Sequence, residues 1–170
     1  MKWTSTEIAV LGMATTVSVA VLSALALYFA SKRERRRILY SEAVQAILNW
    51  NEMLYRVRRR GDNQGRDLIS TFHGLQEELS YYEAWIGSES IYMSRSYTRL
   101  VKAIKSKTES LIRDAWKDPI REEPGDALEI DKHPDVSVDV GSFLRDVRSH
   151  LSPFPWRKIA LVYRNRKDQR

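Results

Sequence analysis

The chain has 170 residues, a formal net charge of +6 and no cysteine. The lack of cysteine excludes disulfide scaffolds and cysteine-dependent catalysis, and it fits a reducing compartment. The three histidines are widely separated in the sequence, which argues against a histidine-based metal centre.

An uncharged stretch runs from residue 8 to residue 30 and is followed at once by the basic sequence KRERRR. This stretch corresponds to about 34 Å of helix, which is enough to cross a hydrocarbon core of about 30 Å. A secretory signal peptide is the alternative, but the apolar run is too long and Lys2 is the only basic side chain before it. The sequence therefore predicts one transmembrane helix over 8–30, after a short extracytoplasmic segment at 1–7.

The basic residues after this helix predict its orientation. Residues 32–37 include five basic side chains and one acidic side chain, and such segments stay on the cytoplasmic side. We therefore expect the N-terminus outside, the remainder in the cytoplasm, and the juxtamembrane segment 31–37 at anionic lipid headgroups. The side chains expected to contact the membrane surface here are Lys32, Arg33, Arg35, Arg36 and Arg37.

Small residues recur every four positions along one face of the predicted transmembrane helix. They are Gly12, Thr16, Ala20 and Ala24. Such a ridge lets two helix backbones approach closely, so it predicts self-association, although small residues are common in any transmembrane helix.

Three amphipathic helices are predicted within residues 38–118. Their apolar residues are spaced mainly by three and four, which is typical of helices packed in a bundle. Turn residues at 61–65 and at Gly87 separate the helices, Pro119 ends the third, and Lys107 interrupts its seam. The three predicted seams consist of Tyr40, Ala43, Ile47, Trp50, Leu54 and Val57; of Leu68, Phe72, Leu75, Leu79, Tyr82 and Ile86; and of Met93, Tyr97, Leu100, Ile104, Leu111 and Ala115.

Two questions about the first of these helices stay open at this point. No glycine or proline lies between the apolar stretch and Tyr40, so one continuous helix over 7–60 and a break near Ser31 both fit the sequence. The first seam is also compatible with two kinds of packing: it either packs into the local bundle or continues a dimer seam from the membrane.

The C-terminal part has a different character. Residues 119–138 contain three prolines and an excess of acidic residues, which indicates an acidic loop. A short amphipathic helix is predicted over 139–152, with Ser137 or Asp139 as its cap, and a basic, aromatic tail over 153–170. The tail residues expected to contact the membrane surface are Trp156, Arg157, Lys158 and Arg164.

Patterns typical of catalysis or ligand binding are missing. His73 and Glu77 share a helical face, but no further histidine-rich segment supplies the remaining ligands of a zinc site. The turn at 61–65 lacks the Gly-Lys-Ser/Thr ending of a phosphate-binding loop. We therefore predict no catalytic residue, no cofactor and no metal, and a protein that is not an enzyme.

Tyr81 and Trp85 lie four positions apart, beside the second seam. They either add to the core or form a patch that binds a protein partner, since tyrosine and tryptophan are enriched at binding hot spots. Basic residues on the third helix have glutamates nearby, so we expect complementary surface charge there and not a nucleic-acid groove.

The predicted fold class is all-α: a single N-terminal transmembrane helix, then a small cytoplasmic antiparallel bundle of three long helices and one short one. The predicted function is a single-pass, membrane-anchored interaction or scaffold protein. Its expected partners are anionic lipid and either an unidentified protein or further copies of itself. The alternative is a self-assembling membrane effector that perturbs the membrane on a cytoplasmic trigger. Tethering of nucleic acid through the basic tail is a third hypothesis.

Overall fold

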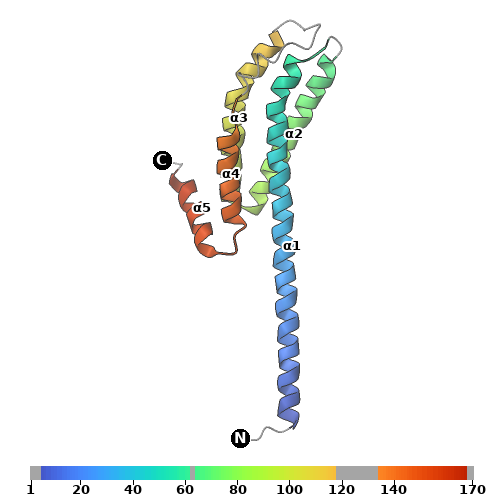
Figure 1. The fold of residues 1–170 in the computed structure, drawn as a ribbon, viewed down its shortest axis with the longest axis vertical. Coiled ribbons are helices and arrows are strands. Elements are labelled where there is room, and N and C mark those ends of the chain that lie inside the picture. The colour runs from blue at the N-terminus through green and yellow to red at the C-terminus, as the bar shows by residue number, and fades with distance from the viewer. Residues whose placement is uncertain (1–4, 62–63, 118–133, 168–170) are drawn as a thin grey trace. The chain divides into compact units, whose positions relative to one another are not determined.

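The structure is a computed structural model that describes residues 5–61, 64–117 and 134–167, with side chains described from residue 13 on except at 14 and 167. These residues form helices and no strand (Figure 1). The chain divides into two compact units, residues 1–38 and 39–170, and each is described by itself. The helices are α1 (Ser5–Arg58), α2 (Gly65–Glu89), α3 (Ile91–Lys117), α4 (Ser137–His150) and α5 (Pro155–Lys167).

The N-terminal unit is formed by the apolar part of α1, and its large side chains are exposed. Leu22, Leu27 and Phe29 are 66%, 72% and 62% exposed, respectively. The helical assignment continues without a break to Arg58, so the continuous form of α1 is the one present. The physical reason is that no glycine or proline occurs between residues 13 and 60.

In the second unit, the first predicted seam lies in the core. All six of its residues, from Tyr40 to Val57, are no more than 3% exposed. The opposite face of this part of α1 is mainly polar, with Ser41, Gln45 and Glu52 exposed. The seam therefore packs into the local bundle, which answers the question that the sequence left open.

The second predicted seam is confirmed, and the third is confirmed with two further buried residues. Every predicted residue of α2 is buried or packs against the core. In α3, every predicted residue is likewise buried or packs against the core, with Leu111 partly buried. The buried row also includes Thr108 and Ile112, which were not predicted, and the Trp50 indole Nε1 donates a hydrogen bond of 3.0 Å to the Thr108 hydroxyl.

α4 is the short fourth helix that the sequence predicted, and it packs into the core of the bundle. Phe143 is 2% exposed, and its ring centre lies 6.2 Å from that of Tyr40 and 5.7 Å from that of Tyr97. At the other end of α4, Lys107 of α3 forms an ion pair with Asp139. The residue that interrupted the third seam thus holds α4 against α3.

α4 begins at Ser137, two residues before the predicted start. Neither predicted cap acts there. The backbone N–H of Ser137 donates to the Asp135 carboxylate over 2.8 Å, and this hydrogen bond lowers the pKa of Asp135. Of the predicted acidic loop at 119–138, residues up to 133 lie outside the described part of the chain.

A buried arginine ties the end of α1 to the end of α3. Arg60 is 7% exposed, and its Nη1 donates to the carbonyl oxygens of Val57 at 2.9 Å and Ala115 at 2.6 Å. Its Nη2 donates to the carbonyl of Trp116 over 3.1 Å. The last carbonyls of a helix lack intrahelical partners and carry partial negative charge, so the guanidinium satisfies the C-terminus of α3.

We expect Arg60→Ala to lower the free energy of unfolding by about 2 kcal/mol, because it leaves buried carbonyl groups without donors. The matched control is Arg59→Ala, since Arg59 is exposed and should change stability by less than about 0.5 kcal/mol. Urea unfolding of the full chain in mild detergent, followed by tryptophan fluorescence, measures both. Equal destabilisation by the two variants would contradict the capping role of Arg60.

Candidate functional site

The tail for which the sequence predicted no secondary structure contains a helix, α5, of 13 residues. It starts with Pro155, which is well suited to the first position of a helix, and it packs against α3 and α4. Leu161 and Asn165 face the bundle and are 2% and 1% exposed. A single large apolar side chain of α5 is thus fully buried among the described residues, so other contacts must hold the helix in place.

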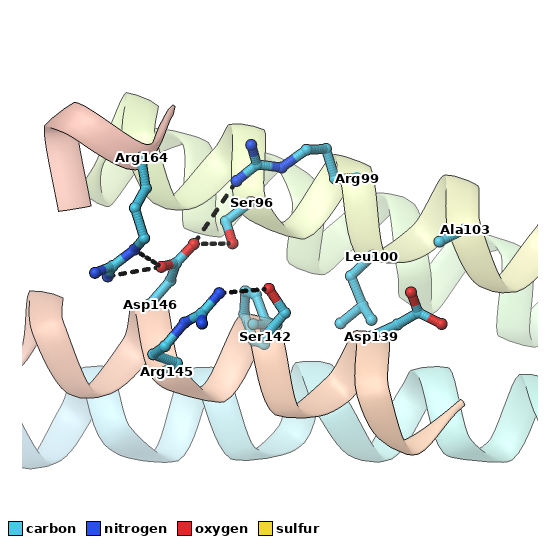
Figure 2. A pocket seen from close by; sticks show the side chains of 10 residues that line it. Ser96, Arg99, Leu100, Ala103, Asp139, Ser142, Arg145, Asp146 and Arg164 are labelled. Atoms are coloured by element: carbon cyan, nitrogen blue, oxygen red, sulfur yellow. Dashed lines mark hydrogen bonds and ion pairs between the residues drawn. The ribbon is translucent and has the colours of Figure 1, made fainter. Parts of the chain in front are cut away.

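A buried carboxylate on α4 supplies those contacts (Figure 2). Asp146 is 3% exposed, and its Oδ1 accepts hydrogen bonds from Nε and Nη2 of Arg164 at 3.0 and 2.9 Å. Its Oδ2 accepts a hydrogen bond of 2.9 Å from Ser96 and lies 3.7 Å from Nη2 of Arg99. A carboxylate removed from water needs cations and donors around it, and here α3 and α5 provide them.

Two further hydrogen bonds extend this network. Nη2 of Arg164 donates to the Ser149 hydroxyl over 2.9 Å, and Nη2 of Arg99 donates to the side-chain oxygen of Asn165 over 3.1 Å. A hollow of about 240 Å³ lies beside the network and is lined by residues of α3, α4 and α5. We call Ser96, Arg99, Asp146, Ser149, Arg164 and Asn165 the α5 clamp.

The α5 clamp includes one of the predicted membrane-contact residues. The sequence grouped Arg164 with Trp156, Arg157 and Lys158, and its guanidinium contacts Asp146 and Ser149 while the side chain is 30% exposed. Contact of Arg164 with lipid stays a prediction. The other three residues are exposed. Asp146 itself was missed by sequence analysis, because an aspartate on an amphipathic helix gives no sign of burial.

The outward side of α5 carries a row of exposed apolar side chains. Trp156, Ile159 and Tyr163 are 61%, 68% and 71% exposed and are spaced by three and four residues. Three basic side chains on the same helix are also exposed, and none has an ion-pair partner among the described residues. We define the α5 face as Trp156, Ile159, Tyr163 and Arg166, which share the outward side of the helix.

A second aromatic surface lies on α2. Tyr81 and Trp85 are 56% and 52% exposed, so they do not belong to the core, and their ring centres are 6.1 Å apart. Glu77 precedes Tyr81 by four residues and is also exposed, which places it in the same helical row. We define the α2 face as Gly74, Glu77, Glu78, Tyr81, Ala84 and Trp85.

The two faces carry opposite charge. α2 contains five acidic residues and one arginine, whereas α5 contains five basic residues and no acidic residue. The electrostatic environment of Tyr82 supports the acidic character of the α2 region, because burial raises its pKa and Glu42 and Glu78 raise it further. The bundle therefore presents an acidic aromatic face and a basic aromatic face.

The remaining predicted site residues belong to the N-terminal unit. Thr16, Ala20 and Ala24 are exposed on α1, while Gly12 lies in the helical part whose side chains are not described. The predicted juxtamembrane residues Lys32, Arg33, Arg35 and Arg37 are exposed, and Arg36 is half-buried. Their roles in self-association and lipid contact stay predictions.

Within the described part of the chain, no group of three or more histidine, aspartate or glutamate side chains is arranged to hold a metal ion. His73 is exposed on α2. No family model, curated protein or solved structure matches this chain. The functional argument therefore depends on the surfaces of the molecule itself.

Removal of the Arg164 guanidinium should loosen α5. In Arg164→Met, the buried Asp146 keeps only Ser96 and Arg99, so we expect amide hydrogen exchange in 155–167 to accelerate by about tenfold or more. Arg157→Met is the matched control on the same helix, because Arg157 is exposed and outside the clamp. Exchange measured by mass spectrometry on the full chain tests this. Unchanged protection of α5 in Arg164→Met would rule out the clamp.

Proposed function

We propose that this chain is a single-pass, membrane-anchored helical adaptor that is not an enzyme and that holds protein partners at the cytoplasmic face of a membrane. The observation that carries this proposal is the exposed apolar surface of the N-terminal unit. Valine, leucine and aromatic side chains from Met13 to Phe29 are about half to three-quarters exposed. A continuous apolar surface of this kind requires lipid or protein around it.

The length and composition of α1 support lipid as that environment. Among the described residues, one helix is long and apolar enough to cross a membrane. None of its most apolar stretch is buried within the structure. A core helix of a soluble protein would bury most of this surface. The basic residues that follow it favour the cytoplasmic side for the bundle and attract anionic headgroups.

An adaptor role for the bundle is supported by where its aromatic side chains lie. Tyr81 and Trp85 on α2, and Trp156 and Tyr163 on α5, are large side chains that the bundle leaves exposed. Tyrosine and tryptophan contribute strongly to protein interfaces because they bury much area with few rotatable bonds. Only eight residues, 31–38, connect the predicted span to the bundle, so a protein bound there is held near the membrane.

Selective labelling of introduced cysteines tests the anchoring, because the natural chain has no cysteine. We expect Thr4→Cys to react with a membrane-impermeant maleimide in intact bacterial cells, and Ser41→Cys to react only after permeabilisation. Ser41 is exposed in the bundle, so a lack of labelling in intact cells reports its compartment and not its burial. Labelling of Ser41→Cys in intact cells would contradict the orientation, and recovery of the chain in the soluble fraction would contradict the anchor.

A further inference from the structure

We propose that the α2 face of one copy binds the α5 face of a second copy, so that anchored chains join head to tail. This inference rests on the proposed function and names the partner of the adaptor as another copy of the chain. It accounts for both exposed aromatic surfaces with one contact.

The chemistry of the two faces is complementary. The α2 face combines Tyr81 and Trp85 with Glu77 and Glu78, and the C-terminal part of α2 from Gly74 to Glu89 has no lysine or arginine. The α5 face combines its aromatic row with Arg166, while Arg157 and Lys158 are exposed beside it in the first turn of α5, which has no acidic residue. Apolar contact supplies affinity in such an arrangement, while opposite charge selects the partner and its orientation.

The two faces do not meet within one bundle. α5 packs on α3 and α4, whereas α2 packs on α3. A contact between the α2 face and the α5 face must therefore join two copies. Because each copy offers both faces, the contact is heterologous and extends into a ring or an open row.

A glycine on the α2 face leaves space in which the backbone of another helix could lie. Gly74 lies in the middle of α2 at an exposed position, and a Cβ added to it would meet nothing within 4 Å. Glycine at such a position costs about 1 kcal/mol of helix stability relative to alanine, and the bundle itself does not need it. With Ala84 on the same face, it leaves room for a second backbone between bulky aromatic side chains.

Lipid is the other partner with the right chemistry for the α5 face, and the observations favour a second copy over it. Anionic lipid would satisfy the α5 face but would be repelled by the glutamates of the α2 face, which would stay uncovered. A second copy covers both faces at once. Anchoring in one membrane also raises the local concentration of copies, so a weak contact is sufficient.

Disulfide trapping in the full-length chain tests this contact. Ala84 and Ala160 are exposed on α2 and α5, and the natural chain has no cysteine that could compete. In phosphatidylcholine vesicles under mild oxidation, we expect an equal mixture of the Ala84→Cys chain and the Ala160→Cys chain to give dimers. A chain that carries both substitutions should give a ladder of multimers, because each copy then links to two neighbours.

Charge reversal makes the test specific. Glu77→Lys with Glu78→Lys in the Ala84→Cys chain should lower dimer yield by about tenfold, which corresponds to about 1.4 kcal/mol. Arg157→Glu with Arg166→Glu in the Ala160→Cys chain should restore it. Glu109→Lys and Arg113→Glu, at exposed positions of α3, are the matched controls and should leave the yield unchanged.

Three results would overturn the proposal. One is equal dimer formation by each single-cysteine chain alone, which would indicate a symmetric contact. The second is an absence of dimers together with a response to lipid. In that case, the emission of a fluorophore attached to the thiol of the Ala160→Cys chain would shift to the blue when phosphatidylserine is included, which would assign the α5 face to lipid. The third is a loss of yield in the α3 controls. Failure of the anchor itself is seen separately, in the labelling of the Thr4→Cys and Ser41→Cys chains.

Discussion

Folding removes the carboxylate of Asp146 from water, and the positions of the outward surfaces depend on how that charge is satisfied. A carboxylate at 3% exposure needs cations and hydrogen-bond donors, and the nearest ones come from α3 and α5. The chain after α4 must therefore turn back so that Arg164 reaches Asp146. That return directs Trp156, Ile159 and Tyr163 away from the bundle.

The core of the bundle was predictable because its signal is local. Seams with spacings of three and four identified the buried residues of α1 and α2, and each depends only on neighbours along one helix. An omission in α3 shows the limit of this reasoning. Thr108 was passed over as polar, yet it is fully buried and accepts a hydrogen bond from the indole N–H of Trp50, 58 residues away.

The candidate site was only partly predictable, for a related reason. The sequence left two interpretations of Tyr81 and Trp85 open, burial in the core and exposure as a patch, and both residues are exposed. A helix with several aromatic residues does not show by its sequence which of them the neighbouring helices cover. Burial of Asp146 and Arg60 was not predictable at all. Each pairs with groups distant in the sequence, and a charged residue is normally placed at the surface until such a partner is known.

The packing of α1 restricts where bundles can join one another. Within residues 39–58 of α1, the seam is used inside the bundle and the outward side chains are mainly polar, so this part of the helix has no apolar stripe for a coiled coil between copies. Exposed aromatic side chains remain on α2 and α5.

Exposed ion pairs contribute only about 0.2–1 kcal/mol each, so charges on these faces select orientation while buried aromatic area provides the affinity. A contact of this strength is weak between molecules free in solution, and it becomes effective when a membrane confines the copies to one surface. In the proposed function, the anchor supplies the local concentration of copies that the proposed contact requires.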